Sequence, residues 1–225
     1  DLHPRSTQAP IQNGEPDFET MKLRSLKNIL LGFLATQEGE HQERLETQYD
    51  DSENMTDIFT AFILRLKRAE NPKKLIKDFY ARYGQHDGSA LQDLQFAISS
   101  LEREDKIELI EETMENTKLF DPEMPNHWLK LIRDGFIRKS PMLHASQESD
   151  GETTFPGYAA VARMIEKCPI PMAASHLISQ AFKDITHVDK ARKAGMVKEI
   201  RSLAENNELD PEVKLTAQKI LDAVG

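Results

Sequence analysis

Apolar side chains recur three or four positions apart along almost the whole chain, and this spacing constrains the fold more than any other feature of the sequence. Side chains at such intervals share one face of an α-helix, whereas a half-buried strand alternates at every second residue. The first stripe is typical and consists of Phe18, Met21, Leu26, Ile29, Leu30, Phe33 and Leu34. The pattern predicts a chain of amphipathic helices.

Residues that favour helix starts stand at the polar breaks between these stripes. Asn71-Pro72, Phe155-Pro156 and Asp210-Pro211 are three examples. Proline suits the first helical turn because its missing N–H has no partner there in any case. Together the stripes and breaks predict roughly ten to twelve helices joined by short loops.

Short connections place consecutive helices side by side and antiparallel. Helix pairs stacked in chain order form a superhelix. We therefore predict an all-α fold, specifically an α-solenoid of antiparallel helix pairs in the HEAT or armadillo style. The stripes have no strict sequence period, so the sequence predicts the architecture without a repeat motif.

The domain organisation follows from where the periodicity begins. Residues 1–16 are polar and rich in proline, and we expect a flexible lead-in or a linker remnant there. Residues 17–225 are expected to form a single superhelical domain, interrupted mainly by an irregular polar loop from His144 to Thr154. Because the chain opens at Asp1 and not at methionine, we expect a fragment or a processed form.

Charge and cysteine content limit the partners and the compartment. The formal net charge is -9, from 38 acidic and 29 basic residues, which disfavours nucleic acid as a partner. The chain has no apolar run of the roughly 18 residues that a spanning helix needs, so no membrane is expected. Cys168 is the only cysteine, which rules out an intrachain disulfide and a cysteine metal cluster. A reducing, cytoplasmic location is expected.

The segment Asn54-Met55-Thr56-Asp57 can be read in two ways. Its first three residues match an N-glycosylation acceptor. Asn54 is also a good helix N-cap, Asp57 is placed three residues later to reach back to the cap, and an apolar face follows. We favour the helix start, because a glycan would crowd the cap.

The sequence holds no recognisable catalytic constellation. His-Glu-x-x-His, the Gly-x-x-x-x-Gly-Lys phosphate loop and the Gly-x-Ser-x-Gly elbow are all missing. The seven histidines are scattered, and no two have the spacing that would place them on one helix face. Cys168 has no nearby histidine to activate it, and Trp128 is expected in the core. We therefore predict no catalytic residue and no metal site in this chain.

Several short motifs, in order, resemble one known family. They are SLKNILLGFLA at Ser25 to Ala35, Tyr49, Asn54 to Asp57, Pro125-Asn126 with Leu131-Ile132, Leu143-His144, Gly157-Tyr158, and PMAASHL at Pro171 to Leu177. Their order and spacing resemble the C-terminal helical domain of the aminopeptidase N family of zinc peptidases, in its bacterial alanyl aminopeptidase form. The resemblance runs from about residue 20 to near the end of the chain.

This resemblance implies a non-catalytic role. The family's zinc and its ligands belong to a separate catalytic domain, so no cofactor is expected in this chain and zinc is expected in the parent protein. The helical domain would cap the catalytic chamber and restrict access to peptides with a free N-terminus. The implied partners are the catalytic domain of the same parent chain and peptide substrates in transit.

The chain departs from the family pattern at three places. Gln95 stands where the family has a tryptophan, the polar loop before Gly157 is longer, and His176 replaces an arginine. That arginine belongs to the face turned toward the chamber, so the resemblance makes His176 a substrate-channel candidate. A surface histidine without a role is the alternative.

Two functional hypotheses remain open from the sequence. The first is the capping domain of a zinc aminopeptidase that releases N-terminal amino acids. The second is a stand-alone α-solenoid that binds peptides or proteins without catalysis. An enzyme in its own right is disfavoured by the missing constellation.

Overall fold

The computed structural model describes residues 18–35, 41–149 and 152–224. Eleven α-helices lie within these ranges, with one short two-stranded sheet, so the predicted all-α, solenoid-like fold is confirmed. The chain divides into two compact units, residues 1–75 and residues 76–225. The expected lead-in at residues 1–16 lies outside the described residues, and the single domain over 17–225 stays a prediction.

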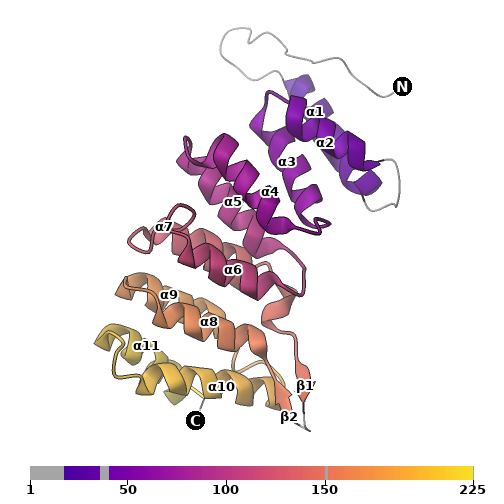
Figure 1. Cartoon of the computed structure of the whole chain (residues 1–225). Coiled ribbons are helices and arrows are strands. Elements are labelled where there is room, and N and C mark those ends of the chain that lie inside the picture. The colour runs from indigo at the N-terminus through magenta and orange to yellow at the C-terminus, as the bar shows by residue number, and fades with distance from the viewer. Residues whose placement is uncertain (1–17, 36–40, 150–151, 225) are drawn as a thin grey trace. The chain divides into compact units, whose positions relative to one another are not determined.

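The first unit contains α1 (Phe18–Ala35), α2 (His41–Asp51) and α3 (Met55–Leu66). Helices α2 and α3 pack along each other, and α1 lies against both (Figure 1). The core between α2 and α3 is aromatic, since the rings of Tyr49 and Phe62 are fully buried with their centroids 6.3 Å apart. Burial of these two rings stabilises the unit.

Helix α3 begins as predicted. The side-chain oxygen of Asn54 accepts hydrogen bonds from the backbone N–H groups of Thr56, at 3.0 Å, and Asp57, at 3.3 Å. The predicted reach of Asp57 back to the cap is wrong, because its carboxylate bonds to Lys27 and Asn28 of α1 instead. A charged partner provides a stronger hydrogen bond than the cap N–H does.

The second unit is a stack of helices. Its boundary with the first unit, between Leu75 and Ile76, falls inside α4. Its elements are α4 (Pro72–Phe79), the π-helix η1 (Tyr80–Gly84), α5 (Gly88–Ser100), α6 (Lys106–Glu115), α7 (Pro125–Trp128), the π-helix η2 (Leu129–Ile137), the 3₁₀-helix η3 (Pro141–Leu143), α8 (Pro156–Glu166), α9 (Pro171–Ala181), α10 (Lys190–Glu205) and α11 (Pro211–Asp222).

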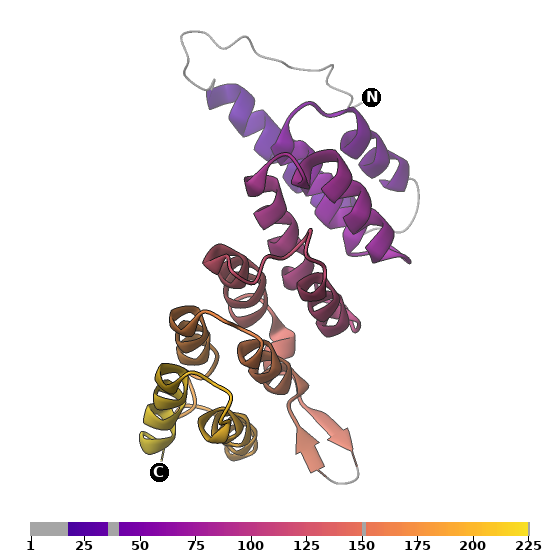
Figure 2. The same cartoon turned by 60° about the vertical axis from the view of Figure 1, so that its left-hand side comes forward.

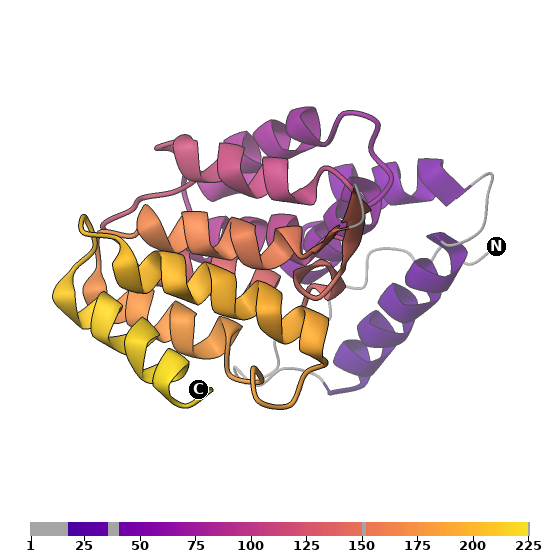
Figure 3. The same ribbon diagram turned by 90° about the horizontal axis from the view of Figure 1, so that it is seen from below.

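The helices of this second unit form two layers. In one layer α5, η2, α9 and α11 follow one another, and in the other α8 lies between α6 and α10. Figure 3 shows α8 and α10 running side by side. Because each helix contacts mainly its neighbours in the stack, this unit has the nearest-neighbour packing of an α-solenoid.

Packing between α5 and η2, neighbours in one layer, requires close approach at a glycine. A Cβ on Gly135 of η2 would lie 1.4 Å from the Oγ of Ser99 on α5, so only a glycine fits there. The side chain of Ser99 is buried, and its hydroxyl donates to the carbonyl of Gln95 at 3.0 Å. Helix periodicity predicted the helices here but not the π-helical winding of η2.

A β-hairpin interrupts the stack, with strands β1 (Gln147–Ser149) and β2 (Glu152–Thr154). The strands are antiparallel, with Gln147 opposite Thr154 and Glu148 opposite Thr153. The expectation of an irregular loop is therefore wrong for these strands. Cross-strand bonding supports the pairing, since the Thr153 hydroxyl donates to the Glu148 carboxylate at 2.7 Å. Figure 2 shows the hairpin projecting from the helices.

Candidate functional site

Within the described ranges, no group of three or more His, Cys, Asp or Glu side chains is arranged to hold a metal ion. None of the helices described here is both long and apolar enough to cross a membrane. The remaining candidates are individual polar side chains and one unusual helix surface.

His176 lies on α9, which packs against η2, α8 and α11. Its ring is half-buried, and Nε2 is shielded from solvent without a hydrogen-bond partner among the described residues. The adjacent Ser175 hydroxyl is in the same condition. An imidazole nitrogen that is buried without a partner has an unmet hydrogen-bonding capacity. Its role as a substrate-channel residue stays a prediction.

Two motifs of the family resemblance meet in the fold. Nδ1 of His144 lies 2.6 Å from the hydroxyl of the fully buried Tyr158. Gly157 makes this approach possible, since a Cβ there would lie 2.5 Å from the carbonyl oxygen of Met142. Burial lowers the pKa of His144 and raises the pKa of Tyr158 to about 12. The pair is therefore a neutral hydrogen bond that ties η3 to α8.

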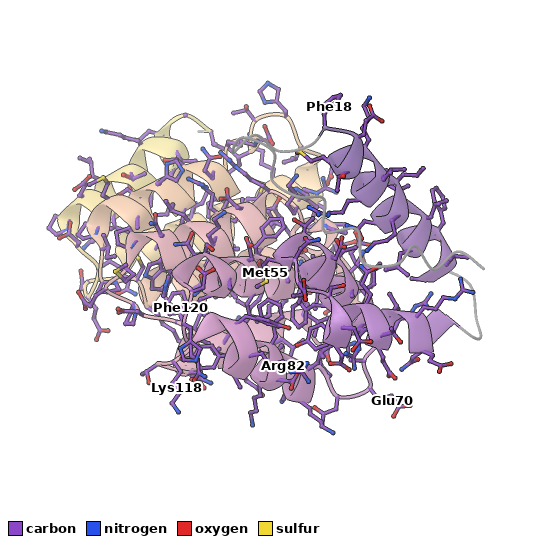
Figure 4. The ribbon with its side chains drawn as sticks, turned by 90° about the horizontal axis from the view of Figure 1, so that it is seen from above. Phe18, Met55, Glu70, Arg82, Lys118 and Phe120 are labelled. Carbon is purple, nitrogen blue, oxygen red and sulfur yellow. The ribbon has the colours of Figure 1, made fainter. Side chains whose placement is uncertain are left out.

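His127 and Trp128 belong to the core. Nδ1 of His127 accepts the backbone N–H of Asp121 at 2.8 Å, and burial lowers the pKa of its imidazole. The indole N–H of Trp128 donates to the carbonyl of Pro122 at 2.9 Å, and the ring meets Phe120 edge-on. Figure 4 labels Phe120 near the turn before α7. The predicted core role of Trp128 is confirmed.

The side chains of Cys168 and Gln95 are also buried in the fold, against backbone carbonyl groups. The Cys168 thiol is buried and lies 3.6 Å from the carbonyl of Ile170, and burial raises its pKa to about 11. A thiol with so high a pKa is not a nucleophile at neutral pH. Gln95, which replaces the family's tryptophan, is buried and donates to the carbonyl of Leu119 at 2.6 Å.

Lys106 is a buried amine that sequence reasoning missed. It is the first residue of α6, its side chain is fully buried, and its Nζ has no hydrogen-bond partner in the described part of the chain. The Nζ lies 5.1 Å from the centroid of the Phe136 ring. Burial lowers the pKa of Lys106 to about 8, partly offset by Glu102. In the run EREDKIE, nothing distinguishes this lysine from its solvated neighbours.

The most unusual surface lies on α1, where seven large apolar side chains are 47% to 67% exposed. We call them the α1 outer face: Phe18, Met21, Leu23, Leu26, Ile29, Leu30 and Phe33. Figure 4 shows Phe18, the first residue of this face, at the start of the helix. Together they make up most of the exposed large apolar residues described for the chain, the others being Met124, Met172 and Leu215.

The opposite side of α1, which contacts α2 and α3, is largely polar. Lys27 Nζ and Asn28 Nδ2 donate to the two carboxylate oxygens of the buried Asp57, at 2.5 and 2.8 Å. Gln48 of α2 donates to Asn28 Oδ1 at 3.1 Å and to the Asp57 carbonyl at 2.9 Å. Only Leu31 and Ala35 of α1 are buried, against Leu45. The helix thus turns its polar side inward and its apolar side outward.

Residues 5–222 match the family described as a domain of unknown function (DUF3458_C) with ARM repeats. The chain is a member of that family, and its stacked helices agree with the ARM-repeat description. Among curated proteins no relative matches the chain.

A solved structure shares the fold. It is the crystal structure of Legionella pneumophila aminopeptidase A in complex with aspartic acid, which superposes with a TM-score of 0.73 at 23% sequence identity. The likeness covers 92% of this chain and 24% of that chain, so the chain spans about a quarter of the length of this relative. The sequence resemblance to the C-terminal helical domain of the aminopeptidase N family is thereby confirmed.

Proposed function

We propose that the chain is the non-catalytic C-terminal domain of a zinc aminopeptidase that releases N-terminal amino acids from peptides. The observation that carries this proposal is the likeness of 92% of the chain to 24% of an aminopeptidase. Zinc and the reacting groups belong to the catalytic domain of the parent polypeptide. That domain and peptide substrates in transit are the partners of this chain.

In this proposal the helical stack acts as a wall of the catalytic chamber. Ion pairs link neighbouring helices of one layer, since Arg163 of α8 lies 2.9 Å from Glu111 of α6 and Lys167 lies 3.7 Å from Glu115. A stack of packed helices encloses volume with few sequence requirements, because each helix needs to fit only its neighbours. Such a wall admits short peptides and excludes folded proteins.

The proposal is tested on the encoded polypeptide. We expect the reading frame to continue upstream of Asp1 into a His-Glu-x-x-His domain, and the full protein to cleave alanyl or arginyl reporter peptides. The chain alone should release no amino acid. Short reporters and a folded protein with an accessible N-terminus are then compared as substrates, and equal turnover of both by the full protein would contradict the proposed restriction.

A stand-alone module that binds proteins or peptides is the second candidate. The α1 outer face favours it, because a contiguous exposed apolar surface is typical of an interaction site. A start codon immediately before Asp1 would support this candidate over the first.

A further inference from the structure

We propose that the groove between α10 and α11 is the surface through which two copies of this protein associate as a two-fold symmetric dimer. The inference is independent of the proposed function, because it uses only residues of the second unit and no property of an aminopeptidase. It assigns one occupant to the groove, which is the same groove of a second copy.

The groove consists of two adjoining hollows of about 730 and 490 Å³, which share Ala204 of α10 and Gln218 of α11. Helix α10 packs into the second unit through Met196, Ile200 and Leu203, which are buried and do not line the groove. The groove side of α10 is therefore a separate face from the one that the stack of helices uses.

The floor of the groove is apolar and half-buried. It is formed by Val197, Ala204, Leu209, Leu221 and Val224. Apolar side chains that are only half-buried within one chain gain further burial when a partner covers them. Ala204 belongs to both hollows, and its small side chain allows another helix to approach α10 closely.

Four charged side chains line the groove, and two of them have no partner in their own chain. Lys214 and Asp222 bond to side-chain amides nearby, at 3.3 and 2.7 Å. The side chains of Arg201 and Glu205 are exposed and make no hydrogen bond or ion pair among the described residues. These two residues stand four positions apart on α10 with the basic one first, which is the less favourable order for a pair within one helix.

A two-fold axis gives Arg201 and Glu205 the partners that they lack. When two copies of α10 lie antiparallel with the axis at the level of Leu203, residues equally far from that level on either side lie opposite one another. Arg201 and Glu205 are each two positions from Leu203, so Arg201 of one copy meets Glu205 of the other, and this contact occurs twice. Val197 of one copy then lies toward Leu209 of the other. The groove is thus complementary to itself in charge and in apolar contact.

A partner with one predominant charge fits the groove less well. Its lining has two basic side chains, Arg201 and Lys214, and two acidic ones, Glu205 and Asp222. Neither a basic nor an acidic segment gains net attraction from this balance, whereas a second copy does. The formal net charge of -9 opposes association at long range, but physiological salt screens that repulsion beyond about 8 Å.

Charge reversal in the full encoded polypeptide tests the inference. Sedimentation equilibrium at about 0.15 M salt measures self-association where the net charge is screened. We expect the native polypeptide to form a dimer. R201E and E205R should each raise its dissociation constant at least ~10-fold, because each places two like-charge contacts in the interface. The control K219E reverses an exposed charge of α11 outside the groove and should leave the dissociation constant unchanged.

Two rescue experiments show whether the contact joins two copies. R201E/E205R exchanges the two charges and should restore the native dissociation constant. An equimolar mixture of R201E and E205R should also associate as the native polypeptide does, since the acidic pair of one variant meets the basic pair of the other. Mixing cannot restore a contact that lies within one chain. The melting temperature of each variant shows that it is folded.

Each outcome upholds or overturns the inference. A native polypeptide that stays monomeric at about 50 μM would overturn it, including the case in which another part of the polypeptide covers the groove. Dimers that R201E and E205R leave intact would place the contact elsewhere and overturn it as well. Folded variants that do not associate when mixed would refute the antiparallel pairing. A dimer restored by charge exchange in a polypeptide without peptidase activity would uphold the inference while the proposed function fails.

Discussion

The ammonium of Lys27 on α1 lies 2.5 Å from a carboxylate oxygen of Asp57 on α3, and Asp57 is only 6% exposed. The pair joins two helices through residues that are 30 positions apart in the sequence. Because Asn28 and Gln48 also bond to Asp57, this one residue connects all three helices of the first unit. It holds α1 in the orientation that turns its apolar side outward.

Replacing Asp57 with alanine should destabilise the first unit by about 1–3 kcal/mol, because the partly buried donors on Lys27 and Asn28 lose their acceptor. Urea unfolding followed by circular dichroism measures the change. In a double-mutant cycle with Lys27→Met, the two effects should sum to more than the double variant loses. Additive effects would show that the ion pair contributes nothing to stability.

Lys106→Met should stabilise the second unit by about 1–2 kcal/mol at pH 7, because it removes a buried charge that has no hydrogen-bond partner among the described residues. The folded pKa, about 8, is lower than the unfolded value. Between these two values the unfolded state binds more protons, so the native lysine becomes less destabilising as the pH rises. The advantage of methionine should therefore shrink between pH 7 and pH 9.5 in chemical unfolding experiments.

Lys198→Met is the matched control for that experiment, since Lys198 lies exposed on α10. Its stability relative to the native chain should not change with pH. A constant advantage of Lys106→Met across the pH range would contradict the predicted titration of the buried amine.

Local chemistry explains why the helix starts were predictable from the sequence. Asn54 and Asp210 cap their helices with side-chain oxygens that accept N–H groups two or three residues away, so the signal lies within a few residues. The periodicity of α1 likewise predicted an apolar face. It could not predict what covers that face, because the partner of a stripe is set by contacts distant in the sequence.

The burial of several polar residues could not be predicted from the sequence for the same reason, because the residues that bury them are distant in the sequence. Lys106 is buried by Phe136, which lies 30 positions away, and Gln95 bonds to Leu119, which lies 24 positions away on the far side of α6 in the sequence. His176 was selected from the family resemblance, and the residues next to it in the sequence do not indicate that its Nε2 is buried. The β-hairpin was missed because its strands are three residues each and entirely polar.

Gly157→Ala should destabilise the second unit by about 1–3 kcal/mol. The added methyl group would lie 2.5 Å from the Met142 carbonyl oxygen and 2.6 Å from the Leu143 Cα, and this backbone cannot yield as a flexible side chain does. The shift of η3 would also pull His144 from Tyr158, so thermal unfolding and the Tyr158 resonance should both change. Gly32→Ala is the control, because nothing lies within 4 Å of its added methyl group. Alanine should stabilise that helix by about 0.5–1 kcal/mol.

The stability of the second unit should fall as the pH decreases from 7 to 5. His127 accepts the N–H of Asp121 through Nδ1, and burial lowers its pKa in the folded chain below the unfolded value. As the pH falls through the unfolded value, the unfolded state takes up the proton first, so stability is lost. The same reasoning applies to His144, whose Nδ1 faces the Tyr158 hydroxyl.

His127→Asn tests the contribution of one of these groups, because the asparagine oxygen can accept the same N–H without titrating. The variant should lose less stability than the native chain between pH 7 and pH 5 in urea titrations. His187→Asn, at an exposed histidine, should follow the native pH dependence. If His127→Asn and the native chain have the same slope, protonation of His127 does not drive the acid sensitivity, and the lowered pKa of its imidazole is refuted.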